Sequence, residues 1–303
     1  MLAAGHGLPH RRPEIAGHSV ARRPPPHTLK REGVRPVELW VADAARGLMR
    51  IRDGECRKMA PPCGALCALE QKIFCAGPRW GLCLSRETGA TLYDFPVPTG
   101  VCALAGLGGA VCALSSDADC VQAYGPGGEL LFSAPAGDYP RDLCASPCGR
   151  YLAVAAGAAG EILLFDHRLS CLQRRRVAGA ACAVCFLPRA LAALCAVGDG
   201  ELSSRLLYIS PRGVSQEVLA YPGAPCSLCA LPGGQCLAGC QERAFCLRPD
   251  GALSCAYPCA YPARIRATRM GPLLCDAWRG EVRRMEGGCC YRGEEPCDVC
   301  AFL

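Results

Sequence analysis

A short apolar phrase recurs along the chain at intervals of close to forty residues. It begins at residues 63, 99, 140, 181, 225, 263 and 296. Each copy except the last is followed by a second apolar run, and then by two more runs around a turn. Glycine ends that turn at 89, 128, 213, 251 and 288, whereas the turn DHRL at 166–169 has none. Four short strands joined by hairpin turns make one antiparallel propeller blade, so we expect an all-β protein built from such blades.

The two ends of the repeated region predict how the blades close into a ring. Residues 38–62 supply the second, third and fourth strands of a unit that lacks a first strand, and residues 296–303 supply a lone first strand. The 266 residues from 38 to 303 divide into seven units of 38. An open ring would leave strand edges exposed. The sequence therefore predicts a seven-bladed β-propeller over 38–303, closed by its C-terminal strand.

Residues 1–37 differ from the rest of the chain. They carry seven basic and two acidic residues, which is +5 of the net +6, and four of the five histidines. With the run RRPPPH and almost no apolar periodicity, this basic, Pro-rich tail is predicted to be disordered. It could act as a basic arm for nucleic acid or an anionic surface, although it has few aromatic residues to stack on bases. A start codon assigned too far upstream would explain the tail equally well.

Composition favours the cytosol. The chain has 26 cysteines, yet it is long enough to form a core without disulfides, and its first residues contain no apolar segment behind a basic start. We therefore expect free thiols in a reducing, cytoplasmic compartment. Gly, Pro or a charge interrupts every hydrophobic stretch, so no membrane span is expected. We also expect a monomer without a cofactor.

The segment SPCGRYLAVAAGAAGEILLFD, residues 146–166, resembles the YVTN-type β-propeller repeat. The matching residues are Ser146, Pro147, Gly149, Leu152, Val154, Leu164 and Asp166, and Cys148 stands where the repeat has aspartate. The chain is thus similar to the YncE-like proteins, a group that includes binding propellers and borders on the lactonase propellers. The resemblance implies a seven-bladed fold and little about function, because propellers host many activities.

The cysteines recur at one position of the first strands. We assign that position to Cys67, Cys102, Cys144, Cys185, Cys229 and Cys300, with Arg266 in the seventh blade. A metal site is one interpretation, since the Cys-x-x-Cys pairs 182/185, 226/229 and 297/300 are present. Residues three apart on an extended strand face opposite ways, however, and inner strands need small side chains. We favour packing without bound metal. Core packing explains Cys240, Cys259, Cys289 and Cys290 least well.

No catalytic constellation is apparent. His167 is the only histidine in the repeated region, and it lies in a turn between third and fourth strands. No phosphate loop, nucleophile elbow or Ser/His/Asp arrangement is present, and acid–base chemistry near neutral pH most often uses histidine. We therefore favour a non-enzymatic binding or scaffold propeller for a protein or a small anionic ligand at the channel entrance. The alternative is a lactonase-like hydrolase acting on a sugar lactone or a similar small anion.

A candidate ligand site lies where the chain closes. Loops between second and third strands place two tryptophans beside arginines on the blades flanking blade 1. With two carboxylates between them, these loops could bind a planar or anionic ligand. The predicted residues are Asp43, Arg46, Arg79, Trp80, Arg266, Asp276, Trp278 and Arg279. The alternative is that each tryptophan covers its own blade interface and each arginine is a solvated charge.

Overall fold

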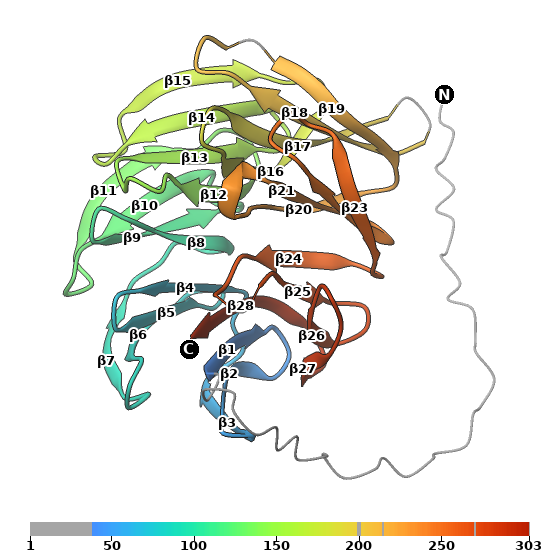
Figure 1. The fold of residues 1–303 in the computed structure, drawn as a ribbon. Coiled ribbons are helices and arrows are strands. Elements are labelled where there is room, and N and C mark those ends of the chain that lie inside the picture. Colours follow the sequence, from blue (N-terminus) through green and yellow to red (C-terminus); the bar gives the residue numbers. More distant parts are fainter. Residues whose placement is uncertain (1–37, 199–200, 214, 270, 303) are drawn as a thin grey trace, which may run out of the picture. The chain divides into compact units, whose positions relative to one another are not determined.

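The computed structural model describes residues 38–302 except 199, 200, 214 and 270. The predicted tail, 1–37, lies outside the described residues, as does residue 303. The described chain forms seven four-stranded antiparallel sheets, with the first strand of each towards a central axis and the fourth strand outermost (Figure 1). Its one helical element is a 3-10 turn at Pro232–Gly234. None of the described segments is a helix of the length and hydropathy that a membrane crossing requires.

The blades are given from the inner to the outer strand. Blade 1 is β28 (Pro296–Phe302), β1 (Glu38–Asp43), β2 (Gly47–Arg52) and β3 (Glu55–Ala60). Blade 2 is β4 (Ala65–Leu69), β5 (Lys72–Ala76), β6 (Gly81–Ser85) and β7 (Thr91–Phe95). Blade 3 is β8 (Val101–Leu107), β9 (Ala110–Ser115), β10 (Cys120–Tyr124) and β11 (Leu130–Pro135). Blade 4 is β12 (Pro140–Ala145), β13 (Tyr151–Ala156), β14 (Glu161–Asp166) and β15 (Cys171–Arg176).

The remaining blades follow the same order. Blade 5 is β16 (Ala180–Phe186), β17 (Leu191–Val197), β18 (Ser203–Ile209) and β19 (Ser215–Pro222). Blade 6 is β20 (Pro225–Ala230), β21 (Cys236–Cys240), β22 (Arg243–Leu247) and β23 (Leu253–Pro258). Blade 7 is β24 (Pro262–Arg266), β25 (Leu273–Asp276), β26 (Glu281–Arg284) and β27 (Cys289–Arg292). The predicted seven-bladed propeller is confirmed.

Strand β28 closes the ring as the sequence predicted. It pairs antiparallel with β1, placing Val299 opposite Val41 and Cys300 opposite Trp40. Val299, Val41 and Trp40 are fully buried. Because the first strand of blade 1 comes from the far end of the described chain, the ring is held shut by backbone hydrogen bonds as well as by apolar contacts.

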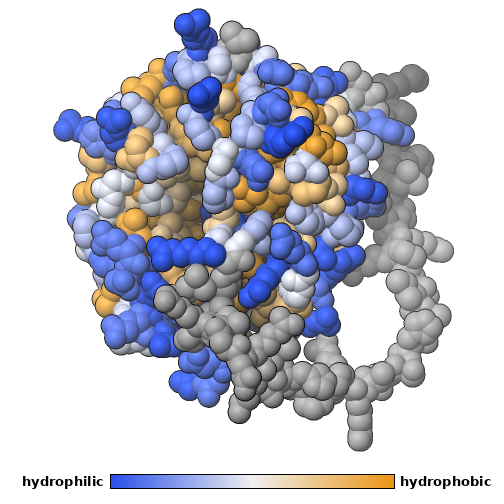
Figure 2. All heavy atoms as spheres, in the orientation of Figure 1, coloured by the Kyte–Doolittle hydropathy of each residue, from blue (hydrophilic) through white to orange (hydrophobic). Residues whose placement is uncertain are grey.

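The hydrophobic core is divided among the interfaces between blades. Middle strands such as β13 are buried on both faces because each sheet packs against two neighbours. Outer strands such as β15 are mostly exposed. On the face seen in Figure 2, hydrophilic side chains lie along much of the rim. Side chains of the middle strands are therefore buried between blades, and ligand contacts are left to the loops, the outer strands and the ends of the first strands.

The turn without glycine has a packing explanation. Leu169 adopts a φ of 60° in the β14–β15 turn, where other blades have glycine at positive φ, such as Gly128 and Gly213. The left-handed conformation costs a leucine roughly 1–2 kcal/mol. Its side chain is buried in the core between blades 3 and 4, beside Leu163 and Phe165. Burial of the leucine side chain offsets the backbone strain.

Register corrects one cysteine assignment. Six of the seven first strands contain a β-bulge near their start. In β8 the bulged residue is Cys102, so the position that Cys144 occupies in β12 is taken in blade 3 by Ala105. The prediction that Cys102 belongs to the recurring position was wrong, because a bulge adds a residue without adding a ladder pair. The bulges also fall at Cys182, Cys226 and Cys297, so the Cys-x-x-Cys pairs do not lie on regular strands.

The thiols are free and mostly sheltered. All 26 cysteines are unpaired, and half of them are buried. Cys240 and Cys259, which sequence patterns left without a packing role, are both buried. Cys240 belongs to strand β21, and Cys259 precedes β24. Cys289 is exposed and Cys290 is partly buried. Within the described ranges, no group of three or more Cys, His, Asp or Glu residues could hold a metal ion.

Candidate functional site

The predicted carboxylate Asp43 holds loops together at the seam between blades 7 and 1. It is fully buried at the end of β1. Its oxygens accept hydrogen bonds from the backbone N–H of Arg46 at 2.9 Å and of Glu294 at 3.1 Å, and from the Tyr291 hydroxyl at 3.0 Å. Burial raises the pKa of Asp43, but these donors outweigh burial and leave that pKa below its usual value. The Asp43 carboxylate is thus engaged by hydrogen-bond donors of this chain and is not free to bind a ligand.

Asp276, at the end of β25, likewise accepts hydrogen bonds from loop backbone. It is fully buried, and it accepts hydrogen bonds from the backbone N–H of Ala260 at 2.8 Å and of Tyr261 at 3.1 Å. Arg279 lies half exposed with its Nε 3.8 Å from an Asp276 oxygen. Trp278 is 66% exposed and stacks on the Tyr261 ring, with 5.4 Å between centroids. Of this group, Trp278 and Arg279 can contact a ligand.

The other predicted seam residues divide between packing and solvent. Trp80 is partly buried, lies over Gly77 in its own turn, and packs against the core between blades 1 and 2. Arg46 and Arg79 are exposed. The exposed acidic pair 294–295 lies between blades 7 and 1 and weakens the attraction of this surface for anions.

Arg266 lies apart from the other predicted site residues. In blade 7, Pro262 at the start of β24 pairs with Asp276, whereas Arg266 pairs with Leu273 at the beginning of β25. Four residues of extended strand separate Pro262 from Arg266, about 13 Å at 3.3 Å per residue. Arg266 therefore sits towards the opposite end of the channel from the seam loops, and the prediction that it lies on their side was wrong. Arg266 lies on a first strand, as predicted, but at the end of that strand that is far from the seam loops.

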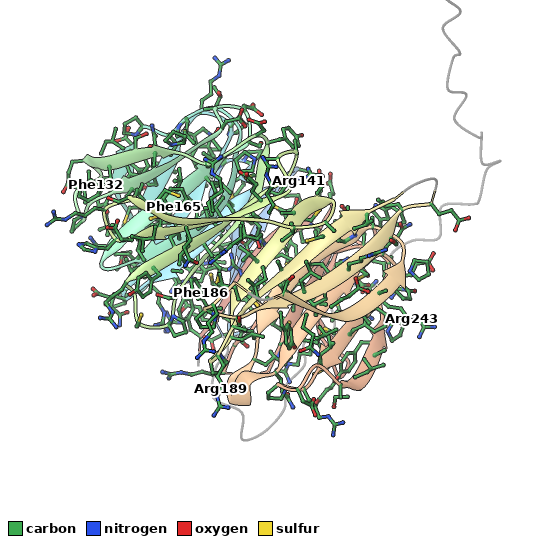
Figure 3. The ribbon with its side chains drawn as sticks, turned by 90° about the horizontal axis from the view of Figure 1, so that it is seen from above. Phe132, Arg141, Phe165, Phe186, Arg189 and Arg243 are labelled. Carbon is green, nitrogen blue, oxygen red and sulfur yellow. The ribbon has the colours of Figure 1, made fainter. Side chains whose placement is uncertain are left out.

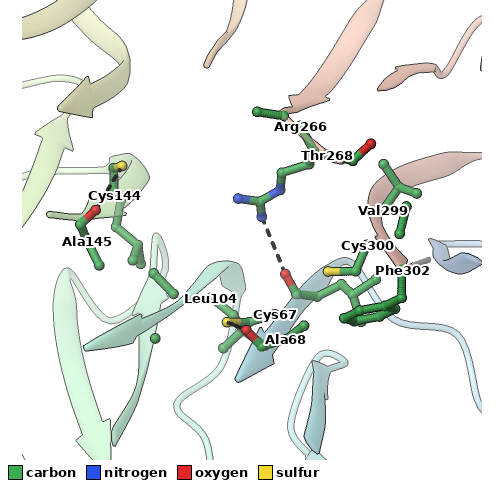
Figure 4. Close-up of a pocket in the computed structure, with 16 residues that line it drawn as sticks. Cys67, Ala68, Leu104, Cys144, Ala145, Arg266, Thr268, Val299, Cys300 and Phe302 are labelled. Atoms are coloured by element: carbon green, nitrogen blue, oxygen red, sulfur yellow. Dashed lines mark hydrogen bonds between the residues drawn. The ribbon is translucent and has the colours of Figure 1, made fainter. Parts of the chain in front are cut away.

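A cavity of about 340 Å³ surrounds Arg266 at the ends of the first strands. Blades 1, 2, 3, 4 and 7 all contribute to it, and its walls include Cys67, Ala105, Cys144 and Cys300. The Arg266 side chain points into this space, with Cys144 on one side and Cys300 on the other (Figure 4). Burial raises the pKa of Cys67 to about 11 and also raises the pKa of Cys144. These thiols are protonated at neutral pH.

One edge of Arg266 is fixed by Asp298 on the neighbouring first strand. Its Nε and Nη2 donate to the two Asp298 oxygens at 2.9 and 2.7 Å, and Nη2 also donates to the Leu66 carbonyl at 3.3 Å. Burial alone would lower the pKa of Arg266 and raise that of Asp298. Their attraction outweighs burial, so the pKa of Arg266 is well above its usual value and that of Asp298 below it.

A second ion pair crosses the channel. Arg264 of blade 7 donates from Nη1 to Asp142 of blade 4 at 2.6 Å, and the other Asp142 oxygen accepts the N–H of Val184 at 3.1 Å. Blades 7 and 4 are not neighbours in the ring, so this pair spans its interior. Sequence reasoning missed both aspartates, although each follows a proline by two residues at the start of a first strand, in PRD and PCD.

Sequence reasoning also missed an exposed thiol with a lowered pKa. Cys148 is exposed in the β12–β13 loop, and its Sγ lies 3.3 Å from the Ser146 hydroxyl. Hydrogen bonds from Ser146 and Arg150 lower the pKa of Cys148 to about 7. The signal in the sequence was the cysteine that stands where the YVTN-type repeat has aspartate.

Comparisons with known proteins show the fold. No protein-family model matches the sequence, and no curated protein matches it. Among solved structures, a protein from Bacteroides uniformis described as a "putative 6-phosphogluconolactonase" is 17% identical, with a TM-score of 0.69 over 88% of this chain and 99% of its own. U3-55K is 14% identical, with a TM-score of 0.67 over 91% and 97%. The Kuenenia stuttgartiensis hydrazine synthase structure is 12% identical, with a TM-score of 0.66 over 78% and 88%. At these identities the likenesses establish the chain as a seven-bladed β-propeller.

Proposed function

We propose that this chain is a binding propeller that takes up a small organic monoanion in the cavity around Arg266. The observation that carries the proposal is the free edge of that guanidinium. Asp298 and Leu66 occupy Nε and Nη2, whereas Nη1 has no hydrogen-bond partner among the described residues and the side chain is 31% exposed. An unused, charge-assisted donor in a cavity of 340 Å³ suits one carboxylate or similar group.

Charge balance limits the ligand to a single negative charge. The two arginines of the channel are matched by Asp142 and Asp298, so the cavity has little net positive charge. A dianion would meet the nearby Asp298 carboxylate with only one donor edge to hold it. The remaining walls are small apolar side chains and thiols, which favour a ligand with an apolar body.

Binding suits this site better than catalysis. A general base works best with a pKa near the operating pH. Asp298 is held below its usual pKa by Arg266, and Cys67 is held above its usual pKa by burial. His167 follows strand β14 in an outer turn, away from the first strands that line the cavity. The groups at the cavity therefore bind and orient better than they exchange protons.

Filling the cavity tests the proposal. Ala105→Phe places a ring in the cavity without touching either ion pair, and Ala45→Phe, in an exposed loop, is the matched control. Benzoate should show saturable binding by ligand-observed NMR to the unmodified protein and to Ala45→Phe, and none to folded Ala105→Phe. Equal binding to all three, or to none of them, would refute a carboxylate site in this cavity.

The alternative is a lactonase-like hydrolase. Two solved Bacteroides propellers with that description share the fold, and the YVTN-type repeat in blade 4 supports placing the chain beside the YncE-like and lactonase propellers. Hydrolysis of 6-phosphogluconolactone by the purified protein, followed by pH-stat titration, decides between them. Turnover above the buffer rate that Ala105→Phe abolishes would replace the binding proposal with the enzymatic one.

A further inference from the structure

A second cavity, of about 220 Å³, lies between blades 4 and 5. Blade 4 contributes strands β14 and β15, and blade 5 contributes the β16–β17 loop and the end of β18. We name this cavity the groove. It is lined by Ile162, Leu164, Gln173, Arg175, Phe186, Leu187, Pro188, Arg189, Ala190, Leu191, Ile209, Ser210 and Pro211. Figure 3 shows Arg189 at the edge of the molecule, on the side away from Arg141.

Strand register explains the apolar walls of the groove. Blade 5 presents a cross-strand row in which Leu191 pairs with both Phe186 and Ile209. On blade 4, Ile162 pairs with Arg175. Two residues along each strand, Leu164 pairs with Gln173, so all four side chains lie on the same face and line the groove. Arg175 therefore enters an apolar space with its guanidinium group.

The adjacent arginines of β15 point the other way. Arg174 and Arg176 flank Arg175, and both form ion pairs with Glu161. The nitrogen-to-oxygen distances are 3.1 Å for Arg174 and 3.7 Å for Arg176. Side chains alternate along a strand, which separates this paired face from the groove face. The run of three arginines is thus split between two environments, and only Arg175 enters the groove.

The groove carries positive charge without an acid. Arg175 is partly buried, its Nε is buried without a hydrogen-bond partner, and no ion pair joins it to a described residue. Arg189 is exposed at the rim and forms no ion pair within the described chain. Among the described lining residues there is no aspartate or glutamate. A buried guanidinium donor without an acceptor is costly, and an anion would remove that cost.

At three other interfaces, the side chain nearest to this corner is apolar or aromatic, although at Gly89 Arg50 lies just behind it. In several blades the glycine of the turn between third and fourth strands packs on an outer-strand residue of the preceding blade. A Cβ on the glycine would lie within 3 Å of that residue. The pairs are Gly89 on Met59, Gly128 on Tyr93, Gly251 on Val218 and Gly213 on Arg175. A cation thus stands in the groove where three other interfaces place an apolar or aromatic side chain.

We propose that the groove binds the carboxylate of a small apolar acid. Arg175 pairs with the carboxylate, Arg189 adds positive charge at the rim, and the row formed by Phe186, Leu191 and Ile209 contacts the apolar body. At about 30 Å³ per water-sized unit, the cavity has room for roughly seven non-hydrogen atoms, which is close to the eight of a six-carbon acid whose carboxylate lies at the opening. This site is separate from the cavity around Arg266 and does not depend on the function proposed for that cavity.

Sodium hexanoate is the probe, titrated by calorimetry into the full chain carrying Ala105→Phe, so that the channel cavity is filled. We expect saturable binding that Arg175→Met weakens at least ten-fold, because the methionine keeps the length and loses the charge-assisted bonds. Arg176→Met, one residue along the same strand on the opposite face, should change the dissociation constant less than two-fold. Acetate and hexan-1-ol should each bind at least ten-fold more weakly than hexanoate.

Gln173→Glu provides a second variant if Arg175→Met does not fold. It places a carboxylate on the same face as Arg175, two residues away, and should compete with hexanoate and weaken its binding at least ten-fold. Hexanoate binding that survives both groove variants, or that responds equally to Arg176→Met, would overturn the proposal. So would the absence of saturable binding to the parent chain.

Discussion

The interface between blades 1 and 2 and the interface between blades 4 and 5 bury arginines in different ways. At the first, Arg50 and Arg86 share the carboxylate of Glu38 at 2.7 and 3.3 Å. Arg86 also lies over the Phe302 ring at 3.7 Å. At the second interface, Arg175 has apolar neighbours and no acid. The same architecture thus contains one completed charge cluster and one that lacks its anion.

The difference comes from single residues at fixed places in the blade. The fourth residue of the third strand is Arg50 in blade 1 and Leu164 in blade 4. Arg50 reaches Glu38 on the adjacent strand β1 of the same blade, and it donates to the Glu87 carbonyl of the next blade at 2.8 Å. Leu164 leaves an apolar wall instead. Arg175 of the outer strand therefore meets an apolar wall and no acid in the groove.

The largest effect should come from removing β28. Deleting 296–303 takes Phe302 from the completed cluster and exposes the inner edge of β1, together with the apolar contacts of Val299. We expect a loss in the free energy of unfolding on the order of 5 kcal/mol, or no folded protein. Urea unfolding followed by tryptophan fluorescence measures it. A midpoint equal to that of the full chain would contradict the closure that β28 provides.

Glu38→Gln should come next. It leaves Arg50 and Arg86 partly buried without a carboxylate, which should cost about 2 kcal/mol in urea unfolding. Glu55→Gln is the control, because its pair with Arg57 is exposed and should contribute close to nothing. If the two variants lose the same stability, the cluster between blades 1 and 2 is no stronger than a surface ion pair, and the comparison fails.

Gln173→Glu should have a smaller effect of the opposite sign. Supplying the groove with an acid beside Arg175 should stabilise the fold by roughly 0.5–1 kcal/mol. In the Arg175→Met background the same substitution should bring no gain, and a double-mutant cycle of unfolding free energies isolates the pair. A gain that persists without Arg175 would mean that the added carboxylate is not stabilised by Arg175, and the comparison would fail.

Trp278→Ala should have the smallest effect. The ring is mostly exposed and stacks only on Tyr261, so the unfolding free energy should change by less than about 0.5 kcal/mol. Hexanoate binding should also be unchanged, because the groove lies on other blades. Loss of hexanoate binding in Trp278→Ala would contradict the groove as the hexanoate site and would point to the exposed tryptophan ring instead. A partner captured by the full chain but lost with Trp278→Ala would support the seam as a protein-binding site.

The repeat predicted the architecture because strands, turns and closure leave local signals. Turn glycines and the unmatched strand at 296–303 were enough for seven blades. The site needed register, which local patterns do not contain. A bulge moved Cys102 out of the recurring position, and the direction of β24 carried Arg266 away from the seam. The sequence RRR predicts that Arg175 faces away from Arg174 and Arg176, because side chains alternate along a strand. Which of the two faces meets blade 5 depends on the register with β14, which the sequence does not show.

Closure by β28 also sets an order of events during synthesis. Strand β1 precedes its partner by more than 250 residues, so at 5–20 residues per second the ribosome needs roughly 13–50 s to deliver that partner. During this interval the apolar residues of β1 have no inner strand to pair with, and the blade that begins the sequence is the last to be completed. A pairing of such long range is slow to form, because the loop entropy must be lost before the contacts are gained. The ring therefore stays open for most of the synthesis of the chain, and blade 1 keeps an unpaired inner edge until β28 has been made.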